Sequence, residues 1–373
     1  MSALKKLRKN TKDALITYGM VAVLFVVVQI LLATGNVSSL IQGQLVPICA
    51  YVVMAVSLNL TVGVLGELSL GHAGFMSVGA FSGAVVAAGM GLNGASDGVR
   101  LLMAILVGGL LAAVAGFLIG IPVLRLRGDY LAIVTLAFGE IIKGIINNLY
   151  VGVDARGLQA SILNDALNLA EGGKVVISGP MGVSGNGKIA TFLAGFLLIM
   201  VCLVVIHNLV DSRSGRAILA LRDNVIAAES VGINITRYKL MTFVISAAMA
   251  GMAGALFALN YSTVVASKFD FNTSILVLVF VVLGGLGNMR GSIIAATLLT
   301  VLPELLRSFA DYRMLIYAIV LILIMLATNN PTLQQFFNGL GEWCESKLGP
   351  WLKRLFGPKA RDKGNTSKKG GAA

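Results

Sequence analysis

Long apolar stretches separated by short polar connections cover most of the chain. A helix needs roughly 20 mostly apolar residues to cross about 30 Å of hydrocarbon. Stretches of that kind lie near 14–34, 44–62, 71–90, 101–124, 129–149, 188–210, 239–261, 271–288, 291–307 and 314–328. The pattern predicts an all-α, polytopic integral membrane protein with about ten transmembrane helices. The stretches at 71–90 and 271–307 are short or rich in glycine, so we expect broken or re-entrant helices there.

The composition excludes a soluble globular protein. Hydrophobic residues make up 57% and charged residues 12% of the 373 residues, against roughly 45–50% and about 25% in soluble domains. The cysteines Cys49, Cys202 and Cys344 are scattered, with neither a disulfide framework nor the spacing of a metal site. The sequence therefore gives no reason to expect a metal or another cofactor.

The net charge of +12 mainly indicates how the chain is oriented in the membrane. With the N-terminus placed in the cytoplasm, most Lys and Arg residues fall in cytoplasmic segments, as the positive-inside rule requires. This predicts an even number of spans, with both termini in the cytoplasm. The basic residues form no folded module interleaved with aromatic residues, which argues against a nucleic-acid partner.

The same pattern divides the chain into three parts. Residues 1–13 form a cytoplasmic N-terminus, 14–328 a transmembrane domain, and 329–373 a cytoplasmic tail with an amphipathic beginning and a basic end. The first apolar stretch is long and lacks a small-residue cleavage pattern, so we expect an uncleaved span. Within the transmembrane domain, 150–187 is expected to be an external loop with room for one short helix, and 212–238 a cytoplasmic loop.

The cytoplasmic loop contains a charged segment, "GRAILALRDNVIAAESVGINITRYK", which runs from Gly215 to Lys239. Ser212 or Ser214 can cap a helix at its start, and Gly232 can end it. Apolar residues recur at helical spacing along one face, namely Ile218, Leu221, Val225 and Ala228. We predict one short amphipathic helix, which either docks in a groove of a soluble partner or is an ordinary interfacial helix.

Ionisable residues inside predicted spans are expensive in lipid and usually face a cavity, a partner or one another. Glu67 and His72 are two such residues, and Glu140 and Lys143 are two more. Glu140 and Lys143 are three residues apart, so they share a helix face and can pair. Three roles remain open for that pair: a structural ion pair, a lining of the substrate path, or a proton relay.

Two glycine-rich interruptions read alike. Residues 64–75, "VLGELSLGHAGF", and 282–293, "VLGGLGNMRGSI", both begin V-L-G-x-L. Paired interruptions in the two halves of a chain are typical of inverted-repeat transporters and point to the substrate path. Coincidence and close helix packing through small residues are the alternatives.

No catalytic site is visible. The chain has two histidines and no G-x-S-x-G elbow. Residues 182–189, "GVSGNGKI", partly fit a phosphate-binding loop, but Ile189 stands where Ser or Thr is required. We therefore expect no enzyme and no nucleotide-hydrolysing centre in this chain.

At this point the residues resemble a known family, the LivM-type permease subunits of bacterial branched-chain amino-acid ABC importers. Four blocks carry the resemblance: "LSLGHAGFMSVGAF" (68–81), "LRGDYLAIVTLAFGEIIK" (126–143), "SGRAILALRDNVIAAESVGINITRYKLMTFVISAAMAGMAGALFA" (214–258) and "VVLGGLGNMRGSIIAATLLTVLPELLR" (281–307). The resemblance implies a multi-pass protein of the bacterial inner membrane. It also implies a second homologous permease, two cytoplasmic ATPases and a periplasmic or lipid-anchored binding protein as partners.

The resemblance also assigns candidate residues. The charged segment is similar to the coupling loop of ABC importers, whose A-A-x-x-x-G core stands here as Ala227, Ala228 and Gly232, with Ile226 in place of the usual glutamate. The full coupling set is Arg216, Arg222, Asp223, Ala227, Ala228, Glu229 and Gly232. Independently of the resemblance, the intramembrane polar residues and the glycine-rich interruptions give the candidates for the translocation path, which are Ser69, Gly71, His72, Phe75, Thr135, Glu140, Gly284 and Gly285. Candidates for contact with the binding protein are Pro180 and Gly182.

The resulting hypothesis is the permease subunit of an ATP-driven importer for branched-chain or other hydrophobic amino acids. A permease of the same family for urea, amides or another small organic solute is one alternative. A carrier driven by an ion gradient, with Glu140 or Glu67 essential, is another. Such a carrier has no need for a helix shaped to fit an ATPase, so the charged segment favours the first reading. The long tail departs from the family pattern, which leaves the role of the tail open. The loop 150–172 is also divergent, which leaves the solute and the binding protein open.

Overall fold

A computed structural model describes residues 2–34, 39–92, 94–124, 129–154, 157–162, 173–185, 187–309 and 312–329. The chain divides into two compact units, Met1–Arg313 and Met314–Ala373. Helix α12 (Arg313–Asn329) supplies the described part of the second unit. The amphipathic and basic tail predicted at 329–373 lies outside the described residues from 330 onward.

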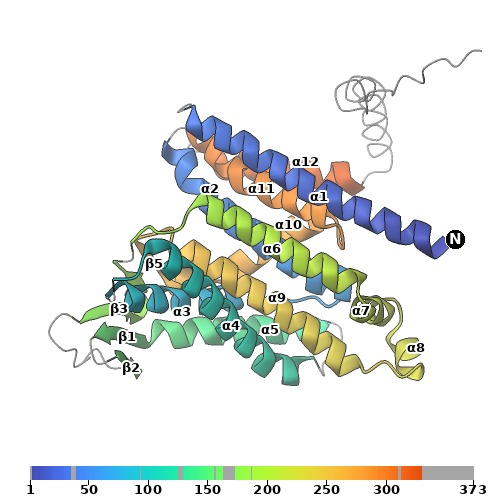
Figure 1. Ribbon diagram of the computed structural model, residues 1–373, viewed down its shortest axis with the longest axis horizontal. Helices are drawn as coiled ribbons and strands as arrows, with labels where there is room; N and C mark the ends of the chain where they lie inside the picture. The colour runs from blue at the N-terminus through green and yellow to red at the C-terminus, as the bar shows by residue number, and fades with distance from the viewer. Residues whose placement is uncertain are drawn as a thin grey trace, which may run out of the picture. The chain divides into compact units, whose positions relative to one another are not determined.

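Among the described residues, seven helices of the first unit are long and apolar enough to cross a membrane. They are α1 (Ser2–Ala33), α2 (Ser39–Asn59) with its π-helical continuation η1 (Leu60–Leu65), α3 (His72–Leu92), α4 (Asp97–Val123), α5 (Asp129–Asn147), α6 (Phe192–Asp211) and α9 (Ile235–Ala258) (Figure 1). Each coincides within a few residues with a predicted span. The helical, polytopic fold is therefore confirmed, because an apolar run in lipid must satisfy its backbone groups within itself.

The predicted breaks are partly right. The stretch 271–307 is divided into α10 (Phe271–Gly284) and α11 (Met289–Leu305), both shorter than a full span, by a turn at 285–288. By contrast, α3 is one continuous helix, and the break expected at 71–90 lies before it, in an extended segment at 66–71. Helix α9 (Ile235–Ala258) begins inside the predicted loop 212–238.

Close backbone contacts build the core of the first unit. Helices α3, α4 and α9 pack together through small residues, and a Cβ on Gly79 would overlap the backbone of Gly251. The span of α2 is 94% buried, whereas those of α1 and α5 are 11% and 22% buried. The outer helices thus expose apolar faces suited to lipid or to another membrane subunit.

A small antiparallel sheet occupies most of the described part of the predicted external loop. Its strands β1 (Leu149–Asp154), β2 (Gly157–Ile162), β3 (Lys174–Ser178), β4 (Val183–Ser184) and β5 (Thr263–Val264) pair in the order β2-β1-β3-β4-β5. Val151 opposes Ala160 on β2 and Ile177 on β3. The prediction of a loop-rich segment was wrong here. Residues 163–172, where the expected short helix would have to lie, are outside the described part.

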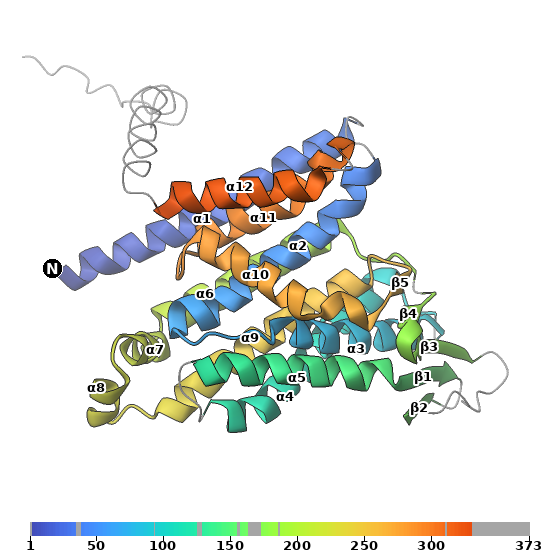
Figure 2. The same cartoon turned by 180° about the vertical axis from the view of Figure 1, so that it is seen from behind.

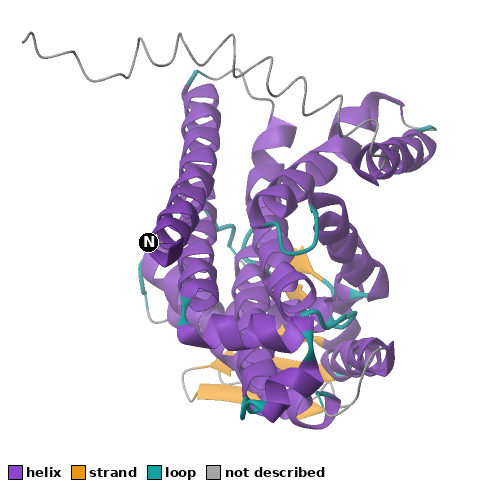
Figure 3. Cartoon of the chain, turned by 90° about the vertical axis from the view of Figure 1, so that its right-hand side faces the viewer, coloured by secondary structure: helices purple, strands orange, loops and turns teal. Residues whose placement is uncertain are grey.

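The sheet and the charged segment lie at opposite ends of the helices. Figures 1 and 2 show β1–β5 at one end of the first unit and α7 (Arg213–Asp223) with α8 (Val225–Ser230) at the other, where α1 also begins. Figure 3 shows the chain from a third side, with the strands partly behind the helices. The helices between them are of membrane-spanning length.

Candidate functional site

The charged segment folds as two capped helices rather than the single one expected. The side chain of Ser212 accepts a hydrogen bond from the Gly215 N–H at 3.1 Å and caps α7. Asn224 then takes an extended conformation, and its Oδ1 accepts from the Ala227 N–H at 3.0 Å to start α8. The apolar spacing predicted one uninterrupted helix and did not take this cap into account. An Asn side chain competes with the backbone for hydrogen bonds, so it can end one helix and start the next.

The apolar face of α7 anchors it to the protein. Ile218 and Leu221 are fully buried, as is Ala228 on α8, whereas Val225 is only half-buried. Six residues of the predicted coupling set are exposed around this anchor: Arg216, Arg222, Asp223, Ala227, Glu229 and Gly232. Gly232 ends α8 as predicted, with φ +84° and its N–H donating to the Glu229 carbonyl at 2.9 Å.

Two aliphatic side chains outside the membrane-spanning helices point to a partner. Ile226 on α8 is 79% exposed and Val231 just after it is 75% exposed. Large exposed aliphatic groups on a short, well-capped helix and at its end are typical of a docking surface. The sequence had marked Ile226 only as a departure from a motif, and Val231 carried no signal before the fold showed both side chains exposed.

Arg222 differs from the other coupling candidates because it reaches back into the permease. Its Nη1 donates to the carbonyl of Gly63 in η1 at 3.0 Å. Nearby, Glu67 and Lys239 form an ion pair in which both side chains are largely buried. That pair joins the extended segment 66–71 to the beginning of α9. Glu67, expected inside a span, therefore lies where the spans approach the α7–α8 end.

The predicted path residues fall into two groups. Ser69, Gly71, His72, Phe75 and Thr135 are brought together and are all buried at the start of α3. Gly284 and Gly285 lie instead at the turn between α10 and α11. Glu140 is the eighth residue and lines a cavity described below.

The start of α3 is tied down by hydrogen bonds. His72 Nε2 lies 2.8 Å from the hydroxyl of Ser57 on α2. The Leu70 N–H donates to Thr135 Oγ1 at 3.1 Å, and the Ala73 N–H donates to Ser274 Oγ at 3.1 Å. The ring of Phe75 packs edge-on against Phe243 as well as His72. These contacts make the group a packed support for the start of α3 rather than an open wall.

A small, partly open cavity with room for about one water molecule lies beside this support, between α3, α5 and the beginning of α10. Its lining residues are Leu70, Gly74, Leu136, Gly139, Glu140, Phe269, Asp270, Phe271 and Ser274. Most of the lining is apolar, and two carboxylates face it. Asp270 was missed by the sequence analysis because it stands outside the apolar runs and outside any recognised motif.

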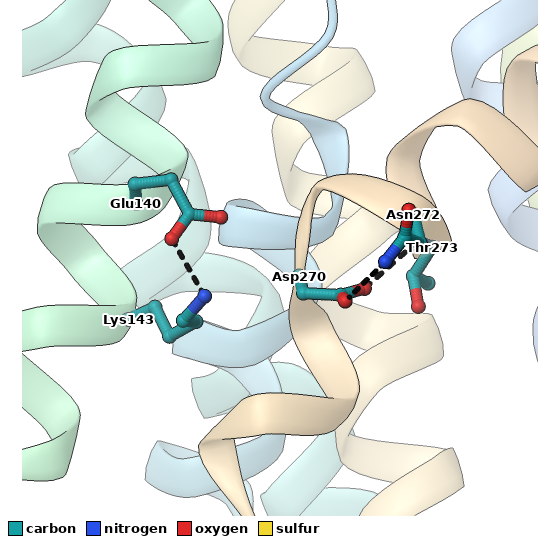
Figure 4. A network of polar contacts seen from close by, with 5 residues as sticks. All are labelled: Glu140, Lys143, Asp270, Asn272 and Thr273. Atoms are coloured by element: carbon teal, nitrogen blue, oxygen red, sulfur yellow. Dashed lines mark hydrogen bonds and ion pairs between the residues drawn. The ribbon is translucent and has the colours of Figure 1, made fainter.

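The two carboxylates have different partners (Figure 4). Glu140 pairs with Lys143 at 2.6 Å on the same helix, which confirms the predicted pairing. Asp270 accepts from the Thr273 N–H at 3.0 Å and the Asn272 side-chain amide at 2.9 Å, capping α10. Such donors stabilise the ionised carboxylate. The cavity therefore combines an apolar wall with one excess negative charge.

The external turn predicted to meet a binding protein is the 3₁₀ turn η2 (Gly179–Met181). Pro180 is exposed, and Met181 beside it is 73% exposed. Gly182 is buried with φ +73°, and a Cβ there would overlap the Val264 backbone. Gly182 thus shapes the turn, and contact of Pro180 and Gly182 with a binding protein stays a prediction.

Comparison with known proteins decides the family. A family model described as "Branched-chain amino acid transport system / permease component" matches residues 40–327. The chain belongs to this family. It is 40% identical over 286 residues to the high-affinity branched-chain amino acid transport system permease protein LivM of Salmonella typhimurium. That alignment covers 74% of this chain and 66% of the relative, so the chain spans about two thirds of that relative's length.

Relatives of lower identity carry different names. The permease protein LivH of Escherichia coli is 25% identical over 282 residues, covering 74% of this chain and 88% of LivH. The fructose import permease protein FruG of Bifidobacterium longum is 26% identical over 244 residues, covering 63% of this chain and 67% of FruG. No solved structure matches the chain significantly. Family membership alone therefore leaves the solute to be argued from the cavity.

Proposed function

We propose that this chain is the permease subunit of an ATP-driven importer for branched-chain or other hydrophobic amino acids. The observation that carries the proposal is the α7–α8 segment, a pair of capped helices at one end of the spans with Ile226 and Val231 exposed. A permease that moved solutes by itself would gain nothing from this apolar surface in water. Membership of the branched-chain permease family supports the same conclusion.

The α7–α8 segment would receive one of two cytoplasmic ATPases, and a second homologous permease would complete the pathway. The beginning of α1 lies at the same end as α7 and α8, so the N-terminus would be cytoplasmic in the inner membrane. The sheet would then face the periplasm, where Pro180 and Met181 offer an exposed turn to a solute-binding protein. ATP hydrolysis would take place in the partner subunits and not in this chain.

As it stands the cavity has room for about one water molecule, and during transport it would widen to admit a small aliphatic zwitterion. Leu70, Leu136 and Phe269 supply an apolar wall for a branched side chain. Glu140 and Asp270 supply carboxylates for an α-ammonium group, and Lys143 lies beside Glu140 to attract a carboxylate. Urea and fructose carry no charge to match these groups, so the cavity favours an amino acid over both.

Neutralising a carboxylate of the cavity should weaken uptake. We expect Glu140→Gln or Asp270→Asn to raise the KM for labelled leucine about tenfold, since a hydrogen bond to a charged group contributes about 1.5–3 kcal/mol. The measurement is uptake by cells that depend on this transporter, with valine, urea and fructose as competitors. Valine should compete, whereas urea and fructose should not.

Glu304→Gln provides the matched control, because Glu304 forms a similar pair with Arg307, three residues later and away from the cavity. That variant should keep the wild-type KM. An unchanged KM in Glu140→Gln would show that the Glu140–Lys143 ion pair has only a structural role. Competition by urea instead of valine would show that the transporter carries urea or another small solute and not an amino acid.

A further inference from the structure

The two glycine-rich interruptions lie against each other. The π-helix η1 ends where Gly66 adopts φ +83°, and α10 ends where Gly285 adopts φ +92°. Gly63 and Gly287 meet at this point, because a Cβ on Gly63 would overlap the backbone nitrogen of Gly287. Segments more than two hundred residues apart in sequence thus share one backbone contact. Single π-helical turns are rare and frequently mark functional sites.

A buried amide fastens the two interruptions together. Asn59, the last residue of α2, is fully buried. Its Oδ1 accepts from the Gly287 N–H at 2.8 Å, and its Nδ2 donates to Ser292 Oγ in α11 at 2.8 Å. Both ends of one side chain are therefore engaged by the α10–α11 region. A movement of η1 would pull on that region through this amide.

Arg222 connects α7 to the same point. Its Nη1 donates to the Gly63 carbonyl, and its stem packs on Gly66, where the position of a Cβ lies 2.8 Å from Arg222 Cγ. Nη1 also lies 3.8 Å from the corresponding position on Gly287. Ile218 and Leu221 are buried and anchor α7. A displacement of α7 would therefore also move Arg222.

The segment after η1 and the helix α10, which meet at the contact between Gly63 and Gly287, both lead to the cavity. From η1 the chain runs through 66–71 to Leu70 and Gly74, which line the cavity, and Glu67 in that stretch is bound to Lys239. Helix α10 begins at the cavity with Phe271 and Ser274 and ends at the glycine turn. A single displacement here therefore reaches two walls of the cavity.

We propose that Arg222 and Asn59 form a relay that passes movement of α7 to both walls of the cavity at once. The proposal rests on the proposed function, in which an ATPase moves α7. Arg222 is accordingly a positioning residue inside the permease and not part of the surface that docks the ATPase. Arg222 acts on η1, and Asn59 extends the same movement to the α10–α11 turn, so the two residues act in series.

The test measures coupling separately from assembly. The complete transporter, with its ATPases and binding protein, is reconstituted in proteoliposomes as wild type, Arg222→Ala, Asn59→Ala and the double variant. We expect Arg222→Ala to keep its ATPase subunits and its ATP hydrolysis, while leucine moved per ATP falls at least tenfold. The double variant should be no worse than the single ones, because the two residues are steps of one relay. Arg213→Ala, exposed on the same helix, should match wild type.

A second readout reports movement directly. Leu286 lies in the glycine turn and is 58% exposed, so a cysteine there, with Cys344→Ser, can be labelled by a water-soluble thiol reagent. ATP should change its labelling rate in the otherwise wild-type protein but not with Arg222→Ala. If Asn59→Ala fails to fold, Arg222→Ala alone decides the question through this rate.

Two results would overturn the relay. Wild-type uptake per ATP and wild-type labelling in Arg222→Ala would show that α7 acts without it. Loss of the ATPase subunits from Arg222→Ala would place the residue in the docking surface. Failure of the proposed function looks different, because uptake by the wild-type complex would then be independent of ATP.

Discussion

Gly63→Ala should destabilise the protein more than any other single-methyl change in α2 or η1. The added methyl group would overlap Asn59 Oδ1 and the Gly287 backbone nitrogen. Either the helices separate or the buried hydrogen bonds of Asn59 break, which costs about 1–3 kcal/mol for each polar group left unsatisfied. We expect a thermal midpoint in detergent several degrees below wild type, measured by size-exclusion chromatography after heating, together with a loss of uptake.

Gly43→Ala is the matched control, because it makes the same change in α2 where a Cβ meets nothing within 4 Å. Alanine loses less conformational freedom than glycine, so this variant should equal wild type or exceed it slightly. Equal thermal midpoints for the two variants would show that the contact between η1 and the glycine turn is loose.

Ile226→Asp should detach the ATPase while leaving the permease folded. Burying an isoleucine side chain at an interface contributes about 2 kcal/mol, which corresponds to about thirtyfold in affinity, and burying the new carboxylate adds to the loss. Because Ile226 is 79% exposed in this chain, the change leaves the isolated permease intact. The measurement is the amount of ATPase that co-purifies with the tagged permease in detergent.

Leu158→Asp places the same charge on a 62% exposed aliphatic site at the other end of the first unit. It should leave ATPase recovery unchanged. If Ile226→Asp retained as much ATPase as Leu158→Asp, α8 would not be the docking surface.

The helices could be predicted from the sequence because a membrane span is specified locally, by about 20 apolar residues in a row. The sheet could not, since strands such as β4 have two residues and β4's partner β5 lies in a distant part of the chain. The break at Asn224 was missed for a different reason. The periodicity of the apolar residues continues through it, and the capping side chain decides the geometry.

Some features of the candidate site could likewise be predicted from the sequence, and others could not. The pair Glu140–Lys143 follows from helical spacing and was predicted correctly. Contacts such as Glu67 with Lys239, or Asn59 with Ser292, join segments far apart in sequence, so no local pattern announces them. The resemblance to a family selected Arg222 but not the direction in which its side chain points, and Asp270 carried no signal at all. Only the fold brings these residues to the glycine turns and the cavity.

The most direct test of the central claim is leucine uptake into proteoliposomes that contain this chain, its partner permease, the two ATPases and the binding protein. Leucine should accumulate when ATP is supplied on the α7–α8 side of the membrane, and uptake should persist when proton and sodium gradients are collapsed. Accumulation driven by a proton or sodium gradient without ATP would contradict the account and make the protein a secondary transporter.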